Sequence, residues 1–503
     1  MSEASVKKTL NNIEETIIEL MKESALPGLA VGVVKDGELV YSQGFGYANI
    51  EKKIPVTADT VFRIMSISKT FTGIGLMQLF EEGQFELDDP VNAYLRSYQI
   101  AIEDKLSHDI SFRHLMTHTS GLGETRNIWD VFRPVVGLAA RPDSYIQTMG
   151  DYYHGRLHAE IPPGEKWCYA NHAFATLAQL IEEISGQPFS EYMLEHVFEP
   201  LGMLKSDYIL SERVRDQLAQ GYEFKKDRFK QVEYLRLATP GCGGVFSSVN
   251  EMSKYMAMLM NKGALNGTQI LKPETLEMMM TAQLETDPRV FGMGLTFFLS
   301  RYGRHSIVHH DGGWPGFISS MQVAPEAGLG VVVFTNSSSR IPHHIAAHIL
   351  RSLLGVKQPM DIFPDDSILE ARHLWSQFCG TYGPSPGLLT NFRTLEHYGG
   401  EVQVMQKGSK LILRGVLGET RKGIVLHRCE AKDPMIYKGF FQHKELTALF
   451  KTDEQGNVDR MELDSDLLYK RSLKNTNSFK LMAFMGSLVS LVLFAFGLKK
   501  YRK

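Results

Sequence analysis

Apolar residues recur every three or four positions at the start of the chain, which is the spacing of one face of an α-helix. The pattern covers about 5–24, so we expect an amphipathic helix that packs against the rest of the protein. Two apolar runs follow, at 29–34 and 39–42, with Asp36-Gly37 between them. A short Asp-Gly connection of this kind is typical of a β-hairpin.

Helical patterns dominate from residue 66 to about 240. One helix is predicted from Ser66 to a stop at Gly83, and another over 174–184 before Gly186. Strand patterns return later, with a helix after them, at 317–323, 330–335 and 342–354 respectively. The sequence therefore predicts an α+β fold in which helices flank an antiparallel sheet, together with a mainly helical lobe.

The pattern changes again after residue 355. Two prolines mark a linker over 356–370, and short apolar runs with turn residues between them follow. These runs cover 402–405, 411–414, 424–427, 448–451 and 458–463. Such spacing is typical of a small antiparallel barrel or sandwich, which we expect over 371–472.

A stretch of 18 residues without a charge covers 481–498, preceded by Lys480 and followed by the basic cluster 499–503. A helix of that length reaches roughly 27 Å, close to the hydrocarbon thickness of a bilayer of about 30 Å. We interpret it as a membrane anchor, with a buried core helix as the alternative. Glutamates interrupt the first twenty residues, so no secretory signal is recognised and the side of the membrane stays open.

These patterns divide the chain of 503 residues into several parts. The expected parts are an N-terminal helix at 1–24, a main domain at 25–355, a linker at 356–370, an all-β domain at 371–472, a second linker at 473–480, a transmembrane helix at 481–498 and a basic tail at 499–503.

Composition removes several classes of function. The formal net charge is −3, and no basic stretch lies inside the globular part, so nucleic acid is not an expected partner. The four cysteines, Cys168, Cys242, Cys379 and Cys429, lie far apart and form no Cys-x-x-Cys pair. We therefore expect no metal site, no redox motif and no cofactor.

The first candidate for chemistry is Ser66, which stands three residues before Lys69 at the start of the predicted helix. Residues at i and i+3 share a face, so the amine lies over the hydroxyl and can act as its base. Ser-x-x-Lys also arises by chance, and Ser5 to Lys8 has the same spelling. The pair gains meaning only from the motifs that follow it.

A phenol and an amide precede the second helix, as Tyr169 and Asn171. Tyr169 can relay a proton, and Asn171 can both donate to and accept from a substrate amide. A packed aromatic is the alternative for Tyr169, and Tyr47-Ala48-Asn49 repeats the spelling. His118, in a polar turn, is either a base or, more in keeping with its neighbours, a structural residue.

The third candidate is His310, followed by Gly312 and Gly313 on a predicted strand. Adjacent glycines on a strand allow a substrate backbone to approach closely, as at the edge of a sheet. His397 to Gly400 imitates this motif outside the main domain.

Together and in this order, Ser-x-x-Lys, Tyr-x-Asn and His-x-Gly resemble the motifs of the class C β-lactamase and penicillin-recognising serine hydrolase family. The resemblance covers about 24–355. It implies an acyl-enzyme on Ser66, with Lys69 and Tyr169 moving protons and Asn171 orienting the substrate. It also implies an oxyanion hole made by the backbone N–H groups of Ser66 and Gly313. The segment Phe378 to Tyr382 resembles the start of a lipocalin-like domain appended to some relatives.

The sequence departs from the family at His310, where many members carry lysine. By the resemblance, histidine variants occur among the DD-peptidases, D-aminopeptidases and esterases of the family and are unusual among efficient β-lactamases. We therefore expect a membrane-anchored peptidase or esterase whose partners are a small-molecule or peptide substrate and a lipid bilayer, and an oligomer is compatible with this. An acyltransferase that uses the same acyl-enzyme, and a non-catalytic binding protein of the same fold, are the alternatives.

Overall fold

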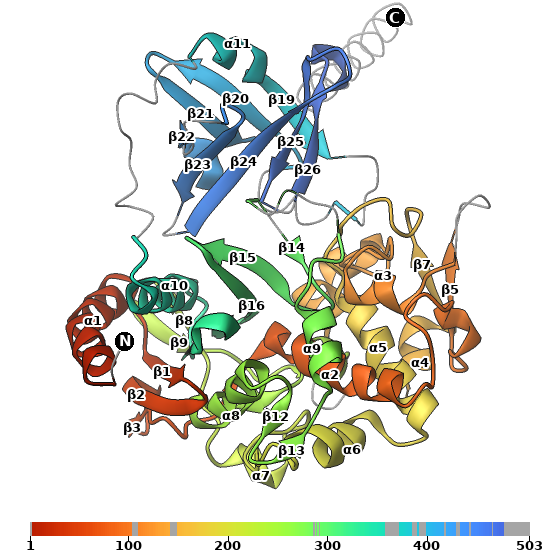
Figure 1. The fold of residues 1–503 in the computed structure, drawn as a ribbon, viewed down its shortest axis with the longest axis vertical. Helices are drawn as coiled ribbons and strands as arrows, with labels where there is room; N and C mark the ends of the chain where they lie inside the picture. The colour runs from red at the N-terminus through yellow and green to blue at the C-terminus, as the bar shows by residue number, and fades with distance from the viewer. Residues whose placement is uncertain are drawn as a thin grey trace, which may run out of the picture. The chain divides into compact units, whose positions relative to one another are not determined.

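The computed structural model describes residues 3–102, 109–140, 148–284, 287, 289–290, 292–357, 372–384, 390–391, 399–416, 419–428, 433–441, 444–464 and 466–476. The chain forms two compact units, 1–361 and 362–503 (Figure 1). Across the described residues, none of the helices is long and apolar enough to cross a bilayer. The predicted anchor at 481–498 lies outside them and stays a prediction.

The first unit is built on an eight-stranded antiparallel sheet with the order β14-β15-β16-β17-β18-β1-β2-β3. The hairpin predicted at its start is present, and it joins the strands that come last in this unit. The strands are β1 Gly28–Lys35, β2 Glu38–Asn49, β3 Ile54–Pro55, β14 Gly292–Met293, β15 Phe298–Tyr302, β16 His305–Trp314, β17 Phe317–Ala324 and β18 Leu329–Thr335.

Helices cover both faces of this sheet, which explains why β1 is buried along almost its whole length. Side chains alternate along a strand, so Ala30 belongs to one hydrophobic core while Val31 belongs to another. The second core is closed by α1 Glu3–Glu23 and α10 Ile341–Leu354, which lie side by side in Figure 1. The N-terminal amphipathic helix is therefore confirmed, with Ile13, Ile17 and Met21 buried.

The other face of the sheet meets α8 Val249–Met260 and the mainly helical lobe. At the centre of this lobe α2 packs against α5, and most of the buried residues of both helices are uncharged. The helices are α2 Ser68–Glu81, α3 Phe112–Met116, α4 Met149–Tyr153, α5 Asn171–Ser185, α6 Phe189–Met193, α7 Glu212–Arg215 and α9 Pro273–Met279. The predicted α+β class is confirmed for this unit.

Short strands complete the loops of the first unit, and one pair of them leads to the candidate nucleophile. In that pair β4 Phe62–Arg63 joins β11 Phe246–Ser247 just before Ser66. The remaining strands are β5 Gln99–Ile102, β6 Ala139–Ala140, β7 Arg156–Ala159, β8 Tyr222–Lys225, β9 Arg228–Gln231, β10 Arg236–Leu237, β12 Ala264–Leu265 and β13 Thr268–Gln269.

The second unit is a closed antiparallel barrel of eight strands, so of the two predicted all-β forms the barrel is the one present. Its core includes Phe378, Tyr382 and Phe450, and the short helix α11 Trp375–Phe378 contributes Trp375. The strands are β19 Gly380–Pro384, β20 Val402–Lys407, β21 Lys410–Gly415, β22 Ile424–Arg428, β23 Ile436–Phe441, β24 Lys444–Thr452, β25 Val458–Leu463 and β26 Asp466–Arg471. The barrel agrees with the lipocalin-like resemblance.

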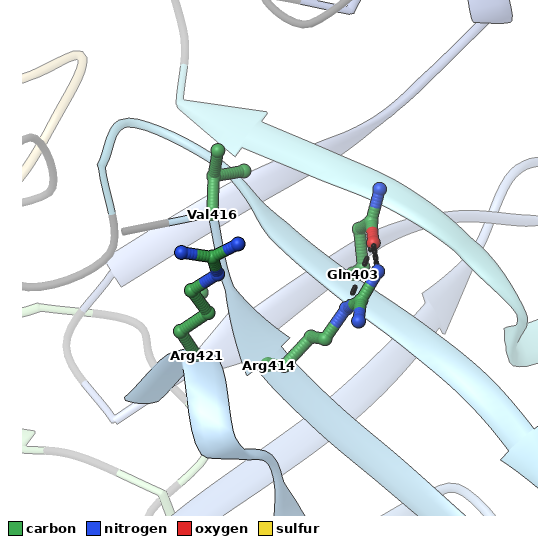
Figure 2. A pocket seen from close by; sticks show the side chains of 5 residues that line it. Gln403, Arg414, Val416 and Arg421 are labelled. Carbon is green, nitrogen blue, oxygen red and sulfur yellow. Dashed lines mark hydrogen bonds between the residues drawn. The ribbon is translucent and has the colours of Figure 1, made fainter. Parts of the chain in front are cut away.

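A pocket of about 190 Å³ lies on this barrel, lined by Gln403, Arg414, Gly415, Val416 and Arg421. Figure 2 shows that two of the lining side chains, Gln403 and Arg414, are hydrogen-bonded to each other. Nε and Nη2 of Arg414 donate to Gln403 Oε1 at 3.0 and 2.8 Å respectively.

Candidate active site

Ser66 sits in a tight turn, the 3₁₀ segment η1 Met65–Ile67 that joins β4 to α2. Met65 has φ 50°, in the left-handed region that costs a non-glycine residue about 1 kcal/mol. Two contacts hold the turn from Ile64: its N–H donates to the Val245 carbonyl at 3.1 Å, and its carbonyl accepts from Ser319 Oγ at 2.7 Å. Ser66 is half-buried, whereas its immediate neighbours are buried.

Gly312 packs directly beneath this turn. A Cβ there would lie 2.2 Å from the Ile64 carbonyl oxygen and 2.3 Å from Ser319 Oγ. The sequence predicted that this glycine lets a substrate approach. In the structure, the group that approaches this glycine closely is the backbone of the turn that carries Ser66.

Lys69 is completely buried and makes three contacts through Nζ. Nζ donates to Asn171 Oδ1 at 2.8 Å and to the Cys242 carbonyl at 2.6 Å, and its third contact is Ser66 Oγ at 3.1 Å. An ammonium can donate to all three oxygens, whereas a neutral amine can donate to two and accept from the Ser66 hydroxyl. The same geometry therefore serves both protonation states of the amine.

Tyr169 and Asn171 meet Lys69 from the start of α5. The Tyr169 ring lies with its centroid 4.8 Å from Lys69 Nζ, and the ring also stacks on His118 with 4.3 Å between ring centroids. His118 Nδ1 accepts the Ala170 N–H at 3.1 Å. The structural interpretation of His118 fits this placement, since the histidine supports Tyr169 and its backbone.

The sequence analysis missed Glu124, which lies in the loop after α3 and is 6% exposed. Its Oε2 accepts from Asn171 Nδ2 at 3.3 Å, which links it to Lys69 through one amide. No spacing rule connects positions 47 residues apart. The available signal was an acidic residue that directly follows the run 115–123, which contains no acidic residue, lysine or arginine.

His310 is 1% exposed and lies beside Phe298, with 4.8 Å between ring centroids and 45° between the ring planes. Its Nδ1 contacts the Asp311 carbonyl at 2.8 Å. Burial and the nearby positive charge of Lys69 lower the pKa of His310 to about 3. At neutral pH the ring is therefore neutral, which makes it a hydrogen-bonding group rather than a cation beside Lys69.

Gly313 lies on β16 beyond the part of that strand that β15 covers. β15 pairs with β16 only as far as His309, whereas β17 continues to Trp314. Gly313 is exposed, and a Cβ there would meet only the Ile318 Cδ1 atom at 3.3 Å. The end of β16 packs against η1, and among the described residues no strand pairs with its side opposite β17.

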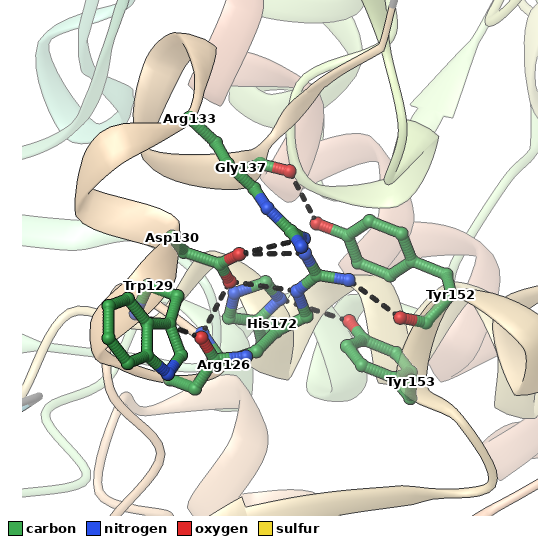
Figure 3. A network of polar contacts seen from close by, with 9 residues as sticks. Arg126, Trp129, Asp130, Arg133, Gly137, Tyr152, Tyr153 and His172 are labelled. Atoms are coloured by element: carbon green, nitrogen blue, oxygen red, sulfur yellow. Dashed lines mark hydrogen bonds and ion pairs between the residues drawn. The ribbon is translucent and has the colours of Figure 1, made fainter. Parts of the chain in front are cut away.

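A buried ion pair fixes the loop that follows Glu124 (Figure 3). Arg126 donates through Nε and Nη2 to the two oxygens of Asp130, both at 2.8 Å, and through Nη1 to the Tyr152 carbonyl at 2.6 Å. Tyr153 Oη contacts His172 Nδ1 at 3.1 Å. Burial, and to a smaller extent the charge of Arg126, lowers the pKa of His172 to about 3. The residue that follows Asn171 in the chain is therefore a neutral histidine.

The structure thus brings Ser66, Lys69, Tyr169 and Asn171 together, with the β16 segment beside them. The decoy Tyr47 is instead 46% exposed on β2. Among the described residues, no group of three or more histidine, cysteine or acidic side chains could hold a metal ion.

Comparisons with known protein sequences show the family of this chain. A family model described as Beta-lactamase matches residues 13–355. Penicillin-binding protein 4* of Bacillus subtilis is 24% identical over 398 residues, which are 73% of this chain and 82% of that protein. The D-aminopeptidase of Gluconobacter oxydans is 28% identical over 337 residues, 66% of this chain and 59% of that protein.

Solved structures with a similar fold include a penicillin-binding protein homologue and a hydrolase. The octameric penicillin-binding protein homologue from Pyrococcus abyssi superposes with a TM-score of 0.60 and 26% identity, covering 92% of this chain and 100% of that one. EstCE1, described as a hydrolase with promiscuous acyltransferase activity, has a TM-score of 0.59 and 20% identity, covering 69% of this chain and 98% of that one. The second likeness concerns the fold alone.

Proposed function

Because this chain belongs to the beta-lactamase family, most of whose members are serine hydrolases, we propose that it hydrolyses a small ester or amide through an acyl-enzyme on Ser66. The observation that carries the proposal is the contact of 3.1 Å between Ser66 Oγ and Lys69 Nζ, made by a completely buried amine. Ser66 is the more exposed partner, as a nucleophile that must reach a substrate requires.

In the proposed first step, Ser66 Oγ bonds to the substrate carbonyl carbon and its proton passes to Lys69 Nζ. Tyr169, whose ring lies against that amine, carries the proton to the leaving group as the bond to the carbonyl carbon breaks. Water then attacks the acyl-enzyme by the reverse proton path. The backbone N–H groups of Ser66 and Gly313 would donate to the oxyanion, and each would lower the activation barrier by on the order of 3 kcal/mol.

The neutral state of His310 supports a substrate without a carboxylate beside the reacting bond. We expect a carboxylate substrate and its methyl ester to show the same pH dependence of kcat/KM from pH 5 to 9. With a pKa of about 3, His310 binds a proton in roughly 1% of molecules at pH 5 and fewer above it, so raising the pH removes no positive charge from this group.

The ratio of the two profiles is the measurement, because the groups that act on both substrates alike cancel in it. A fall of kcat/KM for the carboxylate alone, as pH rises through about 6.5, would contradict a neutral His310 and would indicate that a protonated His310 binds the substrate carboxylate. Covalent labelling with a fluorophosphonate, mapped to a peptide by mass spectrometry, tests the acyl-enzyme itself, and Ser66 is the expected site.

We further propose that 481–498 anchors the enzyme in a membrane, since the segment is uncharged and basic residues flank it. A chain of residues 1–480 is expected in the supernatant after alkaline carbonate extraction of membranes, with labelling at Ser66 intact. The full chain is expected in the pellet. A chain of residues 1–498 is the matched control, because it loses the basic tail and keeps the apolar segment; full-length protein in the supernatant would refute the anchor.

A further inference from the structure

One carboxylate lies inside the site without a role in the proposed reaction. Glu124 Oε2 accepts from Asn171 Nδ2 at 3.3 Å, and Asn171 Oδ1 accepts from Lys69 Nζ at 2.8 Å. Lys69 in turn contacts Ser66 Oγ at 3.1 Å. The four side chains therefore form one continuous chain of contacts from the buried carboxylate to the hydroxyl.

The two ends of this chain fix the orientation of the Asn171 amide. A carboxylate can only accept hydrogen bonds, so it requires the NH₂ group, and the Lys69 amine donates to the carbonyl oxygen. Turning the amide by half a circle would set NH₂ against Nζ and oxygen against the carboxylate, and both contacts would be repulsive. Glu124 thereby determines that an oxygen faces Lys69.

Glu124 also bears on the charge of the site. All three partners of Lys69 Nζ are neutral, and a buried ammonium with no negative charge near it is costly. Glu124 supplies a negative charge one amide away. Burial raises the pKa of the Cys242 thiol. The positive charge of Lys69 opposes this rise in pKa and the negative charge of Glu124 adds to it, so both charges act on the same buried group.

We propose that Glu124 is a positioning residue of this site: through Asn171 it holds Lys69 against Ser66, and its charge favours the proton that Lys69 takes up during attack. This rests on the function proposed above. As the Oγ–carbon bond forms and the Ser66 O–H bond breaks, the proton moves to Nζ and later leaves on the departing group. Glu124 exchanges no atom in the step.

The test is the rate of Ser66 labelling by a fluorophosphonate, measured against pH in the full chain. We expect Glu124→Gln to slow labelling about tenfold and to move the acidic limb of the profile about one pH unit lower. Loss of a negative charge makes the protonated base less favourable, so the base becomes free of its proton at a lower pH. A purely structural role would change stability and leave the limb where it is.

The other titratable groups that face this cluster belong to several elements: Lys69 of α2, His118 after α3, Tyr169 and His172 at the start of α5, Cys242 after β10 and His310 of β16. His172 and His310 have pKa values lowered to about 3, and the pKa of Cys242 is raised. If the acidic limb of the labelling profile lies above pH 5, these three side chains are neutral throughout it and do not contribute to its position.

Glu165→Gln is the matched control, because it removes the same charge from an exposed glutamate four residues before Tyr169. It is expected to label like the unaltered protein. Glu124→Asp keeps the charge at shorter reach and should label more slowly with its limb unmoved. If Glu124→Gln does not fold, Glu124→Ala replaces it with the same expected shift of the limb.

The outcomes separate the two proposals. Failure of the unaltered protein to label at Ser66 would count against the proposed function. Normal labelling of the unaltered protein, with Glu124→Gln matching Glu165→Gln in rate and limb, would overturn the role of Glu124 alone. A slower Glu124→Gln whose limb stays in place, or a limb that moves as far in Glu124→Asp, would also overturn it.

Discussion

Replacement of Ser66 by alanine is expected to abolish covalent labelling by a fluorophosphonate and to lower hydrolysis at least about 10³-fold. In the proposed reaction the hydroxyl supplies the atom that bonds to the substrate. The other hydrogen-bonding partners of Lys69 Nζ are an amide oxygen and a backbone carbonyl, which cannot act as the nucleophile. Labelling followed by mass spectrometry, and initial rates on a short ester, measure the effect.

Stability should hardly change in this variant. Ser66 is half-buried and its side chain makes one contact with a protein group, so the free energy of unfolding should stay within about 1 kcal/mol. Ser5→Ala is the control, since it removes the other Ser-x-x-Lys serine and should label fully. Undiminished labelling of Ser66→Ala at a different serine would refute the assignment of the nucleophile.

The contact between Ser66 and Lys69 could be predicted because it depends on local spacing. Ser66 and Lys69 are three residues apart at a helix start, and that geometry follows from the chain itself. Asn171 came from a motif, but its contact with Glu124 depends on how the loop after α3 folds onto α5. The pKa of His310 likewise depends on burial beside Lys69, which lies 241 positions earlier in the sequence and contributes no local pattern.

The fold shows the same division between local and distant causes. Strands whose apolar residues alternate, such as β20 and β25, were predicted nearly to their ends. β19, β23 and β26 were missed, because glycine, proline or charged residues interrupt the alternation in each. The closed barrel supplies hydrogen-bonding partners on both sides of every strand, so weak formers are held in place by their neighbours.

Substitution of Gly312 by alanine is expected to destabilise the protein by about 3 kcal/mol or more and to abolish activity with it. The new Cβ would lie 2.2 Å from the Ile64 carbonyl oxygen, 2.3 Å from Ser319 Oγ and 3.0 Å from Met65 Cβ. The nearest of these is backbone, which cannot move aside as the end of a flexible side chain can. Either β16 or the turn that carries Ser66 must shift, and a displacement of about 1 Å can lower a catalysed rate by roughly 10²-fold.

Gly313→Ala is the matched control, one position further along the same strand. Its Cβ would meet only Ile318 Cδ1 at 3.3 Å, a side-chain end that can yield, so the free energy of unfolding should change by less than about 1 kcal/mol. Urea unfolding of both variants, read beside Ser66 labelling, measures the difference. Equal stability of the two variants would mean that the chain tolerates a side chain beneath the nucleophile turn, and Gly312 would then have to be explained by the approach of a substrate instead of by packing.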